Sequence, residues 1–243
     1  MELVVSPTLL KTYATCPRKA QAMYVTKEVK YVQNPAAKRG DTLHTLMESA
    51  ANNGWDSIQW PEYPNMQHAK GFIDTIWRLK ASGWFVQAEL QTAIDESWNK
   101  TDWFDKAPKS FMRSKIDICA TNPLYDYAIV IDWKTGKKYE LDTIQLTMNA
   151  MCLKPITGLS KYKMMFAYID SGEVVDHSCE LAPVLFNQYI SMDMNTMSTV
   201  PEAMRDVYDK LYQLDCSLRD DNWPVVKNKF CHWCGVESCP NKK

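Results

Sequence analysis

The chain lacks a hydrophobic run long enough to cross a membrane, and no signal peptide opens it, because the first three residues lead directly into an amphipathic segment. We therefore expect a cytoplasmic, reducing location. The phosphate-binding motif G-x4-G-K-[ST] is also missing from these residues, so we expect no motor domain here. There is no low-complexity tract, no internal repeat and no excess of one charge sign, since the net charge is −1.

The composition is that of a globular protein of modest size. With 243 residues, of which 46% are hydrophobic, the chain can bury one core, and we expect a single domain over 1–243. Hydrophobic periodicity predicts helices over 6–24, 36–53, 65–82, 140–153, 183–196 and 200–219. Alternating and β-branched stretches predict strands over 84–94, 112–120, 126–134, 161–169 and 172–181, the last two joined by a turn at 170–172. This pattern indicates an α/β fold with a mixed sheet flanked by helices and a helical N-terminal portion.

Two acidic strand segments stand close together in the sequence. Lys115-Ile116-Asp117 is followed by Ile131-Asp132-Trp133-Lys134, with turn residues over 121–126 between them. Residues two apart in a strand point to the same side, so Asp132 and Lys134 share a face and Trp133 points away. A hairpin would set Asp117 beside Asp132.

Carboxylates held that close repel each other unless a positive charge lies between them. A divalent cation such as Mg²⁺ or Mn²⁺ suits this ligand set, and such an ion polarises a phosphate oxygen and activates a bound water. Lys134 could then orient the water or stabilise negative charge in the transition state. This arrangement is typical of phosphodiester cleavage. The alternative is a hairpin with surface acids and a solvated lysine.

Further motifs form an ordered set along the chain. Gly40 and His44 lie one turn apart in a predicted helix, Asp117 ends a strand segment, Asp132-Trp133-Lys134 follows, and Gln145 begins the next helix. With these motifs the chain resembles the PD-(D/E)XK nuclease superfamily, and within it the RecB-type exonucleases that carry an iron–sulfur cluster, including CRISPR-associated and phage enzymes. Asn149 departs from this pattern, because a tyrosine is usual there.

The resemblance implies a restriction-endonuclease-like core over about 36–181 and assigns roles to its residues. Lys134, Asp132, Asp117 and Gln145 would be catalytic. The metal ligands for Mg²⁺ or Mn²⁺ would be the side chains of His44, Asp117 and Asp132 and the carbonyl of Trp133. Glu89, in the segment 85–94, is a further candidate acid.

Cysteines form the second chemical pattern. Cys231, Cys234 and Cys239 are spaced C-x2-C-x4-C near the C-terminus, and Cys16 stands far away before Pro17. Three clustered thiols need a fourth ligand to complete a tetrahedral metal site or a four-cysteine cluster. By the resemblance, these four hold a [4Fe-4S] cluster that brings together the segments 6–24 and 227–243.

Zinc also suits four thiolates, so the spacing leaves it open. Disulfides are the third possibility, although they are uncommon in a reducing compartment. The remaining cysteines stand singly among apolar neighbours and are interpreted as small hydrophobes; they are Cys119, Cys152, Cys179 and Cys216.

The charges are distributed unevenly. Residues 1–40 carry seven Lys or Arg and two acids, and residues 227–243 carry four Lys and one acid, so these ends hold +8 and the remainder −9. Basic surfaces attract phosphate backbones without reading sequence. Candidate DNA contacts are therefore Arg18, Lys19, Lys38, Arg39 and Lys229, and the alternative is lysines that only solvate helix faces. The loop 96–109, with Trp98, Trp103 and Phe104, is the best candidate for stacking on unpaired bases.

Together, these features predict a metal-dependent DNA exonuclease acting on single strands or duplex ends in recombination, repair or phage DNA processing. By the resemblance its polarity is 5′→3′. A helicase or recombination partner on a separate chain stays compatible with the sequence. Two alternatives remain open: a CRISPR spacer-processing nuclease, and a non-catalytic nucleic-acid-binding module held together by a zinc or iron–sulfur site.

Overall fold

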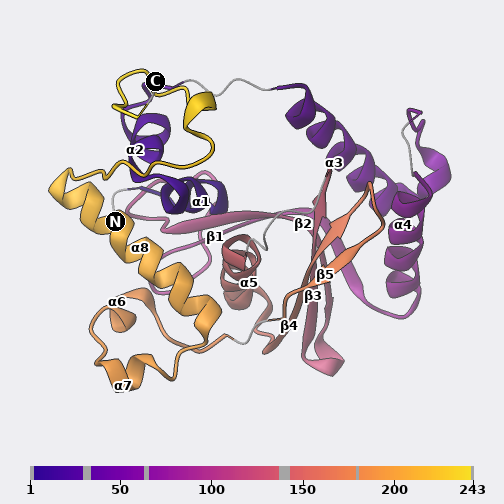
Figure 1. Ribbon diagram of the computed structural model, residues 1–243. Coiled ribbons are helices and arrows are strands. Elements are labelled where there is room, and N and C mark those ends of the chain that lie inside the picture. The colour runs from indigo at the N-terminus through magenta and orange to yellow at the C-terminus, as the bar shows by residue number, and fades with distance from the viewer. Residues whose placement is uncertain (1–2, 30–33, 63–65, 137–142, 179–180, 242–243) are drawn as a thin grey trace. The chain divides into compact units, whose positions relative to one another are not determined.

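The protein is described from a computed structural model that covers residues 3–29, 34–62, 66–136, 143–178 and 181–241. The chain forms two compact units (Figure 1). The first comprises 1–32, 93–113 and 182–243, and the second comprises 33–92 and 114–181. Each unit is described by itself below. No helix among the described residues combines the length and apolar character that a membrane span requires.

A five-stranded mixed sheet forms the centre of the second unit, with the strand order β1-β2-β3-β4-β5. Its strands are β1 (Phe85–Ile94), β2 (Met112–Asn122), β3 (Tyr127–Lys134), β4 (Lys161–Tyr168) and β5 (Val174–Asp176). The β1 and β2 ends at 93–94 and 112–113 belong to the first unit. β2 and β3 form the predicted antiparallel hairpin, with Ile118 opposite Ile131. β3 and β4 run parallel, and β4 pairs with β5 in antiparallel fashion.

Helices cover both faces of this sheet. α3 (Pro35–Asn53) and α4 (Met66–Ala81) lie on one side and α5 (Thr143–Thr157) lies on the other (Figure 1). Leu43, Met47 and Ile73 pack on the first face around Trp133, whose ring meets that of Phe72. Leu146 and its helical neighbours pack on the second face. The predicted α/β fold with a mixed, helix-flanked sheet is confirmed.

Local sequence explains where the helix that carries His44 begins and ends. Asn34 caps α3 by accepting from the Ala37 amide at 2.8 Å, and Pro35 supplies a helical φ at the first position. The helix stops at Gly54, whose φ of +95° suits glycine. The expected helix over 36–53 is therefore confirmed. The prediction for 140–153 extends over 140–142, which lie outside the described residues.

The first unit is helical, but two predictions for it are wrong. The expected helix over 6–24 is broken into α1 (Pro7–Thr15), α2 (Pro17–Ala20) and a π-helix (Gln21–Val25), because Pro17 forces Cys16 into an extended conformation. The expected helix over 183–196 is replaced by two single turns, α6 (Phe186–Tyr189) and α7 (Met194–Met197).

The long helix α8 (Glu202–Asp220) follows the prediction and packs against α1. Tyr13 of α1 shares a hydrogen bond of 2.8 Å with Ser217 of α8, and its ring meets that of Trp223 edge to face. In the second unit, a strand is predicted for 172–181, and among the described residues it extends only over Val174–Asp176. Residues 179–180 of the predicted strand, which include Cys179, lie outside the described residues.

Candidate metal centre

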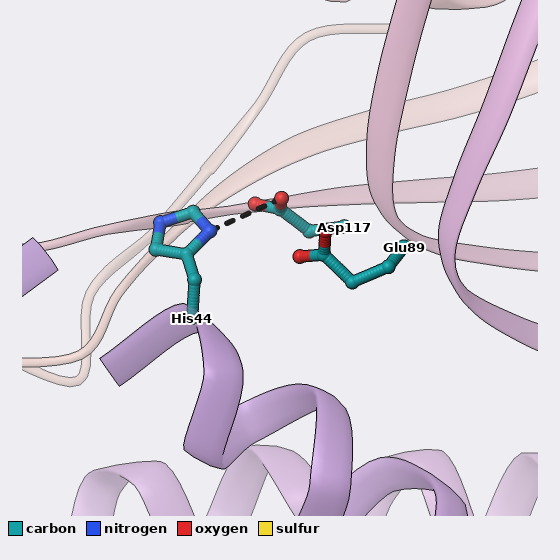
Figure 2. A group of neighbouring side chains, drawn as sticks. All are labelled: His44, Glu89 and Asp117. Carbon is teal, nitrogen blue, oxygen red and sulfur yellow. Dashed lines mark hydrogen bonds and ion pairs between the residues drawn. The ribbon is translucent and has the colours of Figure 1, made fainter. Parts of the chain in front are cut away.

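Three side chains from three elements converge in the second unit. His44 of α3, Glu89 of β1 and Asp117 of β2 each offer a ligand atom, and these atoms lie within 4.8 Å of one another. Figure 2 shows the Glu89 side chain reaching from its strand toward the Asp117 carboxylate and the His44 ring. His44 Nδ1 lies 3.1 Å from Asp117 Oδ1, and Figure 2 shows the other ring nitrogen on the far side of the ring. The tautomer protonated at Nε2 therefore offers its Nδ1 lone pair to a cation shared with the carboxylates.

At Gly40, α3 lies close to the end of β3. A Cβ at Gly40 would lie 3.4 Å from Thr135 Oγ1, directly after the end of β3. Because His44 lies one helical turn further on, this approach brings its ring to the sheet.

Glu89 reaches the centre through an irregularity in its strand. Its φ is +52°, a left-handed conformation that is uncommon for a residue other than glycine. Such a residue interrupts the strand alternation and directs its side chain away from the regular position. The structure therefore places the candidate acid Glu89 with His44 and Asp117 in one group of possible ligands.

Asp117 is fixed on both of its oxygens. Oδ1 faces His44, and Oδ2 accepts a hydrogen bond of 2.7 Å from the Trp133 backbone amide. Burial lowers the pKa of His44, but the hydrogen bond to Asp117 and the negative charges of the nearby carboxylates outweigh it, so the pKa is raised above 6.5. The site therefore attracts positive charge.

A second group of polar side chains stands beside the first. Lys134 forms an ion pair with Asp132 and donates to Gln145 Oε1 at 3.0 Å, and Gln145 in turn donates to Asp132. The three side chains thus form a closed ring. Asp132 is only 2% exposed, and its burial together with the charge of Asp117 raises the pKa of its carboxyl from 3.8 to about 6.

Asn149, at the position where a tyrosine is usual, lies in the core. It is fully buried, one turn after Gln145, and its side-chain oxygen accepts from the Ser114 hydroxyl of β2. Its amide thus binds the helix to the strand below the site. Asn149 is not among the residues that line the candidate metal pocket.

These residues fit a divalent cation. Two carboxylates and one imidazole suit Mn²⁺, and carboxylates with water suit Mg²⁺. They line a cavity of about 390 Å³ together with other residues of α3 and with Lys115 of β2. Asp132 is not part of the close group, because Lys134 and Gln145 hold its carboxylate. Its role as a ligand, like that of the Trp133 carbonyl, stays a prediction.

The four predicted cluster cysteines line one pocket of the first unit. Cys16 lies at the break between α1 and α2, and the pocket also contains Cys231, Cys234 and Cys239. Hydrogen bonds link the segments that bear them: Asn228 donates to the Thr15 carbonyl at 3.3 Å, and the Arg18 amide donates to the Pro224 carbonyl at 3.2 Å. Cys119 and Cys152 are buried singly, and burial raises the pKa of each thiol to about 12.

The five basic residues predicted to contact DNA differ in whether they form ion pairs within the protein or are exposed to solvent. Arg18 pairs with Glu28 at 2.6 Å, and Arg39 pairs with Asp170. Lys19 lines the cysteine pocket, whereas Lys38 and Lys229 are exposed.

In the loop 96–109, the prediction of base stacking is wrong for Trp98, which is buried. Trp103 lies beneath the Arg113 guanidinium, at 5.4 Å, and Phe104 is 80% exposed. The stacking prediction can therefore apply only to the latter two.

Comparisons with known proteins agree with this geometry. The family model of the PD-(D/E)XK nuclease superfamily matches residues 4–240. A crystal structure described as that of SSO0001 is similar in fold, with a TM-score of 0.51 and 15% identity, over 100% of this chain and 88% of the other. No curated protein matches the sequence. Since the match spans nearly the whole chain, this protein belongs to the PD-(D/E)XK nuclease superfamily.

Proposed function

We propose that this protein is a metal-dependent deoxyribonuclease that degrades DNA from its ends as an exonuclease. The observation that carries the proposal is the pairing of the His44, Glu89 and Asp117 group with the adjacent ring of Asp132, Lys134 and Gln145. One group offers ligands, and the other holds an amine beside them. This combination supports hydrolysis of a phosphodiester bond.

Mg²⁺ or Mn²⁺, when bound there, supplies Lewis-acid activation of the phosphate and of water. The protein's own residues do the rest. Asp117 is held by the Trp133 amide, so its carboxylate needs no reorientation to act as a ligand. Gln145 and Asp132 fix the Lys134 ammonium, which orients the attacking water or stabilises charge on the phosphate in the transition state.

The reaction is tested by digesting end-labelled single-stranded and duplex DNA with Mg²⁺ or Mn²⁺. Lys134→Ala should lower the cleavage rate by at least about a hundredfold, since one transition-state donor contributes that much, while DNA binding stays close to that of the wild type. Lys154→Ala, on the far part of α5 where the ammonium donates to the Leu159 carbonyl, is the matched control. Equal cleavage by the wild type and Lys134→Ala would refute the proposed role of the amine.

The same substrates test the direction of degradation. We propose 5′→3′ polarity on the resemblance to RecB-type exonucleases. Labels placed at the 5′ end should then be released as short products first, whereas labels at the 3′ end should remain in long fragments. Internal cuts in circular single strands would identify an endonuclease instead.

We further propose that the four cysteines hold a [4Fe-4S] cluster. Their shared pocket supports a common metal centre, because thiolates suit both iron–sulfur clusters and zinc. Protein purified without oxygen should be brown, with about four iron atoms per chain. A colourless protein with one zinc per chain would assign the pocket to zinc.

A further inference from the structure

Lys115 is a cation that the fold places inside the candidate metal pocket. It lies two residues before Asp117 on β2, so both side chains point to the same side of the strand, and both line the cavity. Its ammonium forms an ion pair with Glu89, whose side chain is only 10% exposed. Glu89 therefore contacts a fixed positive charge on one side and faces His44 and Asp117 on the other.

Several acids surround this ammonium. Glu89 pairs with the ammonium, and Glu48 and Asp117 line the same cavity. The three negative charges of these carboxylates would be neutralised by the single charge of the Lys115 ammonium together with the two charges of one divalent ion. Asp132 is already paired with Lys134, and the remaining acid of the cavity wall, Asp41, is exposed to solvent.

We propose that the Lys115 ammonium occupies the place of a second metal ion, so that the protein binds one divalent cation in this pocket. The inference rests on the proposed function. It adds that the pocket binds one ion and that Lys115 is the positioning residue that limits the number to one. Lys115 holds the Glu89 carboxylate in place for the single ion.

The geometry of two-ion sites supports this inference. Two metal ions that act on one phosphate stand about 3.5–4 Å apart and are held by shared acidic ligands. Here Glu89 is the acid that could be shared, and one of its oxygens, Oε2, already pairs with Lys115. A second divalent ion would have to displace that ammonium, or stand beside it against electrostatic repulsion.

The inference is tested by counting bound Mn²⁺ with electron paramagnetic resonance and isothermal titration calorimetry, with the cysteine site loaded equally in all samples. The wild type should bind one Mn²⁺, and Asp117→Asn should abolish that binding. Two ions in the wild type would overturn the inference while leaving the proposed function standing. No Mn²⁺ bound by the wild type would instead refute the proposed function.

Variants of Lys115 test its role separately. Lys115→Met keeps the length of the side chain but removes the charge, so a second, weaker Mn²⁺ should enter, whereas Lys115→Arg should keep one. Lys70→Met is the matched control, because Lys70 is also ion-paired and its side chain is 49% exposed, against 52% for Lys115. A folded Lys115→Met protein that still binds a single ion would overturn the inference. If that variant does not fold, the wild-type count decides.

Discussion

At the scale of a single residue, the buried carboxyl of Asp132 lowers the free energy of unfolding of the protein. Its carboxyl is buried beside Asp117, and its pKa is raised from 3.8 to about 6. Above that pKa the folded protein holds a buried charge that is more stable in the unfolded chain. By the linkage relation this costs about 3 kcal/mol at most, and less where the structure relaxes.

Asp132→Asn should therefore stabilise the metal-free protein near neutral pH, by about 1–3 kcal/mol. As the pH falls from about 6 toward 3.8, the folded wild type takes up the proton first, so its penalty and the advantage of the variant both disappear. Chemical denaturation at several pH values with a chelator present measures this.

Asp74→Asn, at an exposed ion pair on α4, is the control and should show little change at any pH. A metal-free Asp132→Asn protein that is less stable than the wild type near neutral pH would contradict the account.

Sequence reasoning identified most of the site residues one by one but not their connections. The strand period of two places Asp132 and Lys134 on one face, and the structure joins them in an ion pair. The position of Glu89 depends on a left-handed backbone conformation that no local pattern signals. Lys115 was recognised as part of the strand motif, but its pairing with Glu89 joins two strands and is not visible in either one alone.

The turn between β4 and β5 illustrates the element scale. Gly172 has a φ of +72°, and a Cβ there would lie 2.8 Å from His68 Cδ2 of α4. The same turn begins at Asp170, which binds the Arg39 guanidinium of α3 and the Gly136 amide after β3. The turn therefore links both helices of one face to the strand ends near the site.

Gly172→Ala should destabilise the protein by roughly 2–3 kcal/mol, because it combines a strained φ with a steric clash. Adding His68→Ala to this variant should restore the part of the stability that is lost through the steric clash. Thermal and denaturant unfolding measure both effects.

Gly71→Ala is the matched control, since it lies within α4 with nothing within 4 Å of the added Cβ, and it should stabilise slightly. Equal effects of the two substitutions would show that the turn does not need glycine.

At the scale of helices and strands, the sequence predicts correctly those elements whose bounds depend on local residues. The hairpin of β2 and β3 was found because turn residues separate two alternating segments, and its register follows. The N-terminal helix was predicted too long because its hydrophobic period continues past Cys16, although Pro17 signals a break. Residues 183–196 have helical periodicity, yet they form only two single turns.

At the scale of the whole molecule, the cysteine pocket joins segments more than two hundred residues apart in sequence. No periodicity connects Cys16 with the C-terminal cysteines, and only the resemblance to cluster-bearing nucleases paired them. A metal centre that closes so long a loop restricts the unfolded chain, and its binding energy adds to the stability of the fold.

Cys16→Ala should therefore lose most of the bound metal and lower the stability of the protein by several kcal/mol, roughly 2–5. DNA cleavage should be lost because the protein unfolds, and not because the acidic metal ligands are changed. Iron analysis, visible absorbance and thermal unfolding test this.

Cys216→Ala is the control, because Cys216 lies on α8 outside the pocket. If Cys16→Ala kept its colour, iron content and stability, Cys16 would not be a cluster ligand.

The proposed reaction requires a divalent cation bound between α3 and the sheet. Anomalous diffraction from crystals grown with Mn²⁺ tests this most directly. We predict one anomalous peak within coordination distance, about 2.0–2.4 Å, of His44, Glu89 and Asp117, with Lys134 beside it. Peaks only at other positions, or none at this pocket in a crystal soaked to saturation, would contradict the account.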